Sequence, residues 1–268
     1  MKVYKFGGAS IKDARGIRNL AQILSKEQDD IWVVISAIGK TTNALEQVVE
    51  THRPIIEDLH LDLSDTVYDA FVSMGELQST RIVSAYLTSV GIANTWLDAT
   101  HMVVTDSNHR SANVLLPETR ERVREAVESR KTAALKDERP HCWVTQGFIG
   151  GTQDGEVTTL GREGSDYSAA VFANVLDAES VTVWKDVPGI LTADPRRYSE
   201  AQLIQELNYE DAIRLAQSGA QIIHPKTIEP LRQKGIPLYV KPFFHPSEPG
   251  TCIHAQAPKL TIPVMWGK

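Results

Sequence analysis

The sequence has few of the features that mark secreted or membrane proteins. Its 268 residues include two cysteines, Cys142 and Cys252, which lie too far apart to form a CxxC motif. Reduced thiols in a cytoplasmic protein are therefore favoured over a disulfide scaffold. No apolar run reaches the roughly 18 residues of a membrane helix, and the N-terminus enters a strand pattern without the apolar segment of a signal peptide. We expect no membrane partner.

Positive charge is also scarce. The 28 lysines and arginines are outnumbered by 34 aspartates and glutamates, which gives a formal net charge of -6, and no run of five basic residues occurs. Proteins that bind nucleic acids usually carry a basic patch for the phosphate backbone. A nucleic acid partner is therefore not expected.

The common nucleotide-binding motifs are missing as well. Gly39-Lys40-Thr41 matches the end of a P-loop, but the position of the first P-loop glycine is Val34, inside a strand pattern. No G-x-G-x-x-G follows a predicted strand, and the His-Arg-Asp and Asp-Phe-Gly tripeptides of protein kinases do not occur. No H-E-x-x-H or closely spaced Cys/His set indicates a zinc site. These absences exclude the P-loop, dinucleotide-binding and protein-kinase classes.

What the sequence does contain is an alternation of short apolar runs and helical patterns. The apolar runs predict strands at 3–6, 31–35, 95–97, 142–145, 180–185 and 236–240, the last closing the series. Helical spacing predicts helices at about 17–24, 64–90, 117–136, 165–177, 208–218 and 225–234, and 150–160 predicts a hairpin. This alternation predicts an α/β fold with a mostly parallel sheet, helices on both faces, and ligands at the carboxyl ends of the strands.

Two glycine-rich turns stand at predicted strand-to-helix junctions. Lys5-Phe6-Gly7-Gly8 ends the first strand, and Gly161-Arg162-Glu163-Gly164 opens the helix at 165–177. Glycine lets the backbone approach a ligand closely, and the following helix directs free N–H groups at an anion. Each turn also carries a cation, Lys5 or Arg162. Two such turns in one chain predict two anionic ligands held face to face, as phosphoryl transfer requires.

These turns belong to a longer series of motifs that keeps its order along the chain. The series comprises Lys5-Phe6-Gly7-Gly8-Ala9-Ser10, Ser36-Ala37 with Thr42-Asn43, Ser73 to Leu77, Gln146 to Gly150, Thr159 to Tyr167, Asp186 to Ile190, Thr192 to Arg196 and His224-Pro225. The series resembles the amino-acid kinase superfamily and, within it, the aspartokinases. The resemblance implies a three-layer αβα sandwich with a mostly parallel central sheet. It implies one catalytic domain over 1–268, with an amino-acid-binding lobe at about 1–170 and a nucleotide-binding lobe at about 171–268.

The implied reaction is the ATP-dependent phosphorylation of the β-carboxylate of L-aspartate to 4-phospho-L-aspartate, which begins lysine, threonine and methionine biosynthesis. An aspartate-like carboxyl, with a pKa of about 3.9, is already ionised, so no general base is needed. The site must supply positioning and positive charge at the transferred group. ATP and L-aspartate are the expected ligands, with Mg²⁺ entering as Mg-ATP and its protein ligands unassigned. Two alternatives stay open: another amino-acid kinase, such as a glutamate kinase, or a catalytically silent paralogue that binds nucleotide or amino acid.

The resemblance also assigns roles to individual residues. Lys5 is the expected catalytic cation, and Asp166 would orient it. An arginine can hold a carboxylate through two hydrogen bonds, so Arg162 would bind the α-carboxylate of aspartate and Glu76 its ammonium. Thr42 and Ser165 would complete the aspartate site. The ATP-binding residues would be Lys5, Gly7, Gly8, Ser10, Lys185, Asp186, Asp194, Arg196 and Tyr198.

Three features depart from the family pattern. Ala9 stands where aspartokinases usually have threonine, and Gln221 stands where they often carry a lysine that reaches the nucleotide. Aspartokinases also commonly continue into paired regulatory domains, whereas this chain stops at Lys268. Either the protein lacks this module or the chain is a catalytic fragment. We therefore expect no C-terminal regulatory domains in this chain and no feedback inhibition of it by lysine or threonine. A homodimer is consistent with the resemblance.

Overall fold

The computed structural model describes residues 1–61, 64–134, 141–219 and 222–261, so the departure at Gln221 lies outside the described residues. The strands are β1 (Lys2–Phe6), β2 (Ile31–Ile35), β3 (Asn94–Trp96), β4 (Val104–Thr105), β5 (Cys142–Gln146), β6 (Ile149–Thr152), β7 (Val157–Thr159), β8 (Ser180–Lys185), β9 (Glu206–Leu207), β10 (Leu238–Pro242) and β11 (Thr251–Ile253). The helices are α1 (Ala14–Leu24), α2 (Thr41–Asp58), α3 (Ser64–Ser89), α4 (Leu116–Ala134), α5 (Gly164–Val175), α6 (Tyr209–Gln217) and α7 (Pro225–Arg232), with a 3₁₀ turn at Ala99–His101.

The large sheet contains eight strands in the order β3-β5-β2-β1-β8-β10-β11-β9. Neighbouring strands run parallel except for β10 and β11, which are antiparallel. The predicted mostly parallel sheet is therefore confirmed. β1 lies between β2 and β8, and Lys5 pairs with Val34 on one side and Val183 on the other. This central position brings the end of β1 next to the ends of both neighbours.

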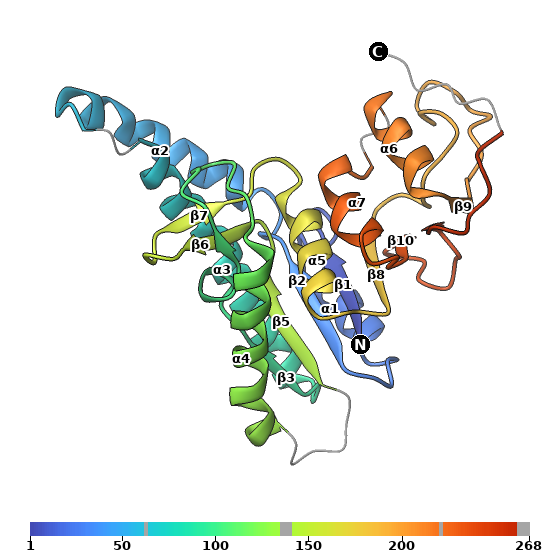
Figure 1. Ribbon diagram of the computed structural model, residues 1–268, viewed down its shortest axis with the longest axis horizontal. Helices are drawn as coiled ribbons and strands as arrows, with labels where there is room; N and C mark the ends of the chain where they lie inside the picture. The colour runs from blue at the N-terminus through green and yellow to red at the C-terminus, as the bar shows by residue number, and fades with distance from the viewer. Residues whose placement is uncertain (62–63, 135–140, 220–221, 262–268) are drawn as a thin grey trace.

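Helices cover both faces of this sheet (Figure 1). Along β1 the side chains alternate, because successive residues of a strand point to opposite faces. Val3 joins a core that includes residues of α4, α5, α6 and α7, whereas Tyr4 and Phe6 join a second core with residues of α1 and α3. The predicted three-layer αβα arrangement is confirmed.

A second, smaller sheet in the order β4-β6-β7 is built on the predicted hairpin at 150–160. β6 and β7 are antiparallel, and Ile149 pairs with Thr159. β6 begins three residues after β5 ends, so the hairpin lies at the carboxyl end of the large sheet. Its second strand leads into the glycine-rich turn at 161–164.

Two local features differ from the sequence-based expectations. Residues 41–58 form α2, a helix that was not among those predicted, and Thr42 and Asn43 lie in its first turn. β10 also does not close the strand series, because β11 follows and pairs with it. In Figure 1, α2 projects away from the sheet together with the start of α3.

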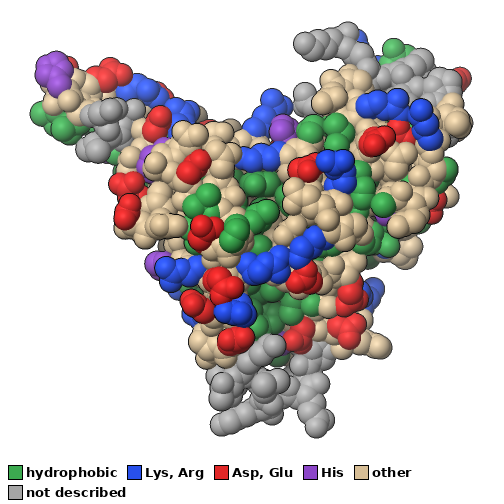
Figure 2. Space-filling view, in the orientation of Figure 1, with side chains coloured by type: hydrophobic (Ala, Val, Ile, Leu, Met, Phe, Trp, Pro, Cys, Tyr) green, Lys and Arg blue, Asp and Glu red, His purple; other side chains and the backbone are tan. Residues whose placement is uncertain are grey.

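The charged side chains of the face seen in Figure 2 are of both signs and interspersed. None of the helices in the described part of the chain combines the length and apolar character that crossing a membrane requires.

Candidate active site

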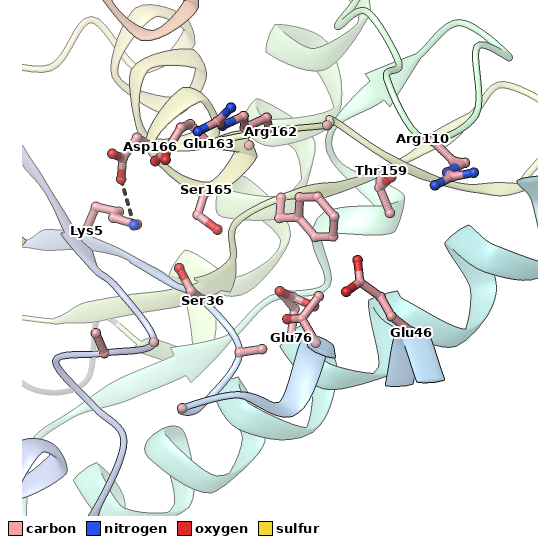
Figure 3. Close-up of a pocket in the computed structure, with 18 of the residues that line it drawn as sticks. Lys5, Ser36, Glu46, Glu76, Arg110, Thr159, Arg162, Glu163, Ser165 and Asp166 are labelled. Carbon is pink, nitrogen blue, oxygen red and sulfur yellow. Dashed lines mark ion pairs between the residues drawn. The ribbon is translucent and has the colours of Figure 1, made fainter. Parts of the chain in front are cut away.

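A cavity of about 480 Å³ opens at the carboxyl ends of β1, β2 and β5. Parallel α/β sheets bind ligands at this edge. Figure 3 shows the side chains that line it. They come from the end of β1, the loop after β2, helices α2 and α3, the segment around Arg110, the β6–β7 hairpin and the start of α5. The lining residues are Lys5, Gly8, Ala9, Ser36, Ala37, Gly39, Thr42, Glu46, Tyr68, Glu76, Arg110, Phe148, Thr159, Gly161, Arg162, Glu163, Gly164, Ser165 and Asp166.

A cluster of one carboxylate and two lysines lies at one end of this cavity. Asp166, in the first turn of α5, is completely buried. Its Oδ1 lies 2.6 Å from Lys5 Nζ and its Oδ2 lies 3.0 Å from Lys185 Nζ. Lys5 and Lys185 come from the ends of the adjacent parallel strands β1 and β8, whose register sets their side chains near one carboxylate. Asp166 therefore fixes two cations at the point where the two strands end.

The electrostatics of this cluster favour the charged forms. Burial by itself would raise the pKa of Asp166, but the charges of Lys5 and Lys185 lower it below the usual value. The carboxylate of Asp166 therefore stays ionised.

The start of α5 lines the cavity, and no side chain caps its N-terminus. Glu163, the N-cap residue, has a φ of 56° and makes no capping hydrogen bond with its side chain. Gly147, just after β5, allows this close approach, since a Cβ there would lie 2.7 Å from the Cβ of Ser165. Ser165 and Arg162, two of the residues expected to bind aspartate, both line the cavity. Arg162 is exposed and also lines a neighbouring cavity of about 270 Å³ beside His224 and Pro225.

Glu76 lies on α3, on the side of the cavity away from Asp166 (Figure 3), and is 3% exposed. Its Oε2 has no hydrogen-bond partner among the described residues. Burial raises the pKa of this carboxyl to about 8, although contacts with the backbone of Ala37 and the side chain of Thr42 oppose the shift. A buried carboxyl with a free oxygen in a cavity has room for a cationic ligand.

The turn after β1 differs from the expectation in one respect. Gly8 lines the cavity, whereas the lining does not include Gly7 and Ser10. The Ser10 hydroxyl donates to the Trp184 carbonyl oxygen at 3.3 Å, and the backbone N–H of Ser10 donates to the Gly7 carbonyl oxygen. α1 begins only at Ala14, with the carboxylate of Asp13 accepting from the Gly16 N–H. The side chain of Asp13 thus caps α1, whereas no side chain caps α5.

The other residues expected to bind nucleotide lie outside the cavity lining. Asp194 and Arg196 pair with each other in the exposed loop after β8, at 2.9 Å between Oδ2 and Nη2. Tyr198 follows in the same loop and is 41% exposed, and Asp186 directly follows β8. Only Lys185 of this group is joined to the cluster at Asp166.

The cavity also contains residues that sequence reasoning did not select. Glu46 accepts a hydrogen bond from the Tyr68 hydroxyl at 2.6 Å, and the Arg110 guanidinium lies 4.2 Å from the centre of the Tyr68 ring. Thr159 lines the same wall. Figure 3 shows Glu46, Glu76, Thr159 and Arg110 on the side away from Lys5 and Asp166. No motif marks Glu46, Tyr68 or Arg110, since each stands in a segment without a recognisable pattern.

Comparison with known proteins gives a consistent result. Residues 1–242 match the sequence model described as the amino acid kinase family. Aspartokinase 1, chloroplastic, of Arabidopsis thaliana is 33% identical over 94% of this chain and 51% of its own length. The aspartokinase of Chlamydia pneumoniae is 32% identical over 94% of this chain and 62% of its own length. The chain therefore spans between half and two thirds of the length of these relatives.

Among solved structures, E. coli aspartokinase III in complex with aspartate and ADP superimposes with a TM-score of 0.82. It is 29% identical to this chain, and the match covers 97% of this chain and 65% of the other. A structure of isopentenyl phosphate kinase, at 15% identity and a TM-score of 0.62, shares the fold alone.

Proposed function

This chain belongs to the amino acid kinase family, and we propose that it transfers the γ-phosphoryl group of ATP to the β-carboxylate of L-aspartate. One observation carries the proposal. In one cavity, Lys5 is held by a buried aspartate that also pairs with Lys185, and a buried carboxyl with a free oxygen lies away from them. The first arrangement suits phosphate and a reacting carboxylate, and the second suits an ammonium group.

In the proposed reaction, one oxygen of the ionised β-carboxylate attacks the γ-phosphorus, and the bond from that phosphorus to the bridging oxygen of ADP breaks. The products are 4-phospho-L-aspartate and ADP, and no proton has to move. Lys5 and Lys185 would stabilise the negative charge on the transferred group, which is where such enzymes obtain most of their rate enhancement. Asp166 holds both lysines in place.

The remaining residues would hold the amino acid. Glu76 would pair with the ammonium and Arg162 with the α-carboxylate, while Thr42 and Ser165 would donate hydrogen bonds. Gly8 and the start of α5 would direct N–H groups at phosphate oxygens. We assign binding of the adenosine part of ATP to the loop that carries Asp186, Asp194, Arg196 and Tyr198. Gly7 and Ser10 would maintain the shape of the turn that binds the phosphates.

Mg²⁺ is expected with the nucleotide. Both oxygens of Asp166 are engaged by lysines, and the described residues contain no group of three or more His, Cys, Asp or Glu side chains suited to a metal ion. The phosphates of ATP and water would therefore supply most of its ligands, which is common for this ion. When bound, the ion would neutralise charge on the phosphates.

The test measures ADP release and traps acyl phosphate with hydroxylamine, in the presence of L-aspartate, L-glutamate or no amino acid. We expect hydroxamate only with aspartate. Product only with glutamate would change the substrate, and ATP binding without turnover would favour a silent paralogue.

The variant Lys5→Met tests the role of Lys5 in the transfer step. It should lower kcat by about 10²- to 10³-fold, as removal of a group that stabilises transition-state charge does, while aspartate still binds in a calorimetric titration. Lys2→Met is the control, because Lys2 lies on the same strand and pairs with Glu27 outside the cavity. Equal activity of the two variants would contradict the role of Lys5.

A further inference from the structure

Arg110 has an unusual backbone conformation for an arginine. Its φ is 64°, in the left-handed region that side chains with a Cβ seldom adopt. Asp69, on α3 and completely buried, accepts the Arg110 N–H at 3.0 Å. The same carboxylate accepts the N–H and the hydroxyl of Thr159, at 3.0 and 2.7 Å. One buried carboxylate thus fixes both the strained residue and the neighbouring wall of the cavity.

The Arg110 side chain makes two contacts of its own. The guanidinium lies 4.2 Å from the centre of the Tyr68 ring, and Nη1 lies 3.3 Å from an oxygen of Asp65. A guanidinium carries five N–H donors, so the contact with Asp65 leaves donors for a ligand. Arg110 lines the cavity. Strain kept by surrounding contacts is common where a side chain has to be aimed at a ligand.

The wall around Arg110 is complementary to the head group of an α-amino acid. Glu76 and Glu46 supply two carboxyl groups and Arg110 supplies a cation, on the side away from Lys5 and Asp166 (Figure 3). If the β-carboxylate of aspartate reacts beside Lys5, its ammonium and α-carboxylate extend toward this wall. The ammonium meets the two carboxyl groups, and the α-carboxylate meets the arginine.

We propose that Arg110 determines substrate specificity by binding the α-carboxylate of the amino acid together with Arg162, from the part of the cavity farther from Lys5. This inference rests on the proposed function, since it takes the phosphoryl acceptor to be an α-amino acid. Arg110 would be a second cation for the α-carboxylate, beside the predicted Arg162, and would select substrates in which this carboxylate is free.

The test uses Arg110→Gly. Glycine adopts a φ of 64° without strain, so the variant should keep the melting temperature within about 2 °C while it loses the guanidinium. We expect KM for L-aspartate to rise about tenfold or more, because a charge-assisted hydrogen bond is lost, with kcat changed less than about twofold, as for an interaction made equally in ground and transition states.

L-aspartate α-amide, which keeps the ammonium and the β-carboxylate, separates direct binding from a structural role. Its KM, or its inhibition constant against aspartate, should be the same for wild type and Arg110→Gly. Arg81→Ala is the matched control, since it removes another arginine that stacks on a ring, 3.9 Å from the centre of Trp96 and outside the cavity lining. That variant should keep the wild-type KM.

Three outcomes would overturn the inference: an unchanged KM for aspartate, an equal loss with aspartate and its α-amide, or a KM increase that accompanies a large drop in melting temperature. Failure of the proposed function gives a different result. In that case the wild-type protein itself would show no turnover or calorimetric binding with any amino acid.

Discussion

Glu76 combines two properties that rarely occur together in a carboxyl group. It is 3% exposed, and its Oε2 has no hydrogen-bond partner in the described part of the chain. A buried polar atom without a partner is unfavourable unless a ligand satisfies it. The unpaired carboxyl of Glu76 therefore lowers the stability of the free protein and provides a binding site for a ligand. Both the stability and the ligand affinity should depend on pH.

Glu76 should make aspartate binding pH-dependent. Burial raises its pKa to about 8, so most of the free protein carries a neutral carboxyl at pH 6. Only the ionised form pairs with an ammonium group, so KM for aspartate should fall as pH rises from 6 to 8 and then level off. Steady-state kinetics of Glu76→Gln should give a high KM without this dependence. The same pH profile in the variant would refute the assignment.

The affinity for aspartate should rise with pH, whereas the stability of the protein should fall. The folded-state pKa lies above the ordinary value of 4.5, so the stabilisation linked to the bound proton is fully present below pH 4.5 and is lost as pH rises through 8. Urea unfolding should therefore show wild type losing stability relative to Glu76→Gln between pH 5 and 9.

The candidate site residues predicted from the sequence belong to motifs. Lys5, Asp166 and Glu76 were predicted because each stands in a short segment of fixed order. Arg110 could not be found in this way, since its role depends on a left-handed backbone and on a carboxylate 41 positions earlier. Neither property leaves a local pattern in the sequence.

At the scale of elements, the turn after β1 is packed directly against the loop after β2. A Cβ on Gly8 would lie 2.3 Å from the carbonyl oxygen of Ala37, whereas a Cβ on Gly7 would lie 3.5 Å from Lys5 Nζ, an ordinary contact. Two adjacent glycines of one motif thus have different structural requirements.

Gly8→Ala should therefore be far more harmful than Gly7→Ala. The added methyl group meets backbone, which cannot move aside as a side chain can, and should lower the free energy of unfolding by about 1–3 kcal/mol. Gly7→Ala should stay within about 0.5 kcal/mol of wild type. Urea denaturation of both variants checks this, and equal stabilities would show that the two loops are not in contact as described.

The elements that were predicted are those with a buried face. α2 was missed although Leu45, Val48, Val49, Ile55 and Ile56 follow helical spacing, because Pro54 interrupts the pattern, and the helix buries only Val49. Strands β4 and β9 have two residues each, too few for an alternating pattern. The segment 180–185 was found because four of its six residues are buried in the middle of the sheet.

At the scale of the whole molecule, the two expected lobes share one sheet. The boundary at about 170 stays a prediction, but β1 pairs with β2 on one side and with β8 on the other. The ion pairs of Asp166 also join Lys5 to Lys185 across that boundary. Separate unfolding of the lobes would require the sheet to split along a paired strand at the candidate active site.

We therefore expect one calorimetric unfolding transition, with equal calorimetric and van't Hoff enthalpies. Aspartate at 100 times its dissociation constant should add about 2.7 kcal/mol of stability, which corresponds to a shift of about 5–10 °C for a chain of this size. The whole transition should shift, because the cavity is lined from β1, α3 and α5 together. Glu76→Gln at the same aspartate concentration should keep the single transition and lose most of the shift. Two transitions, of which aspartate moves only one, would show that the lobes are independent and that the amino acid binds within one of them.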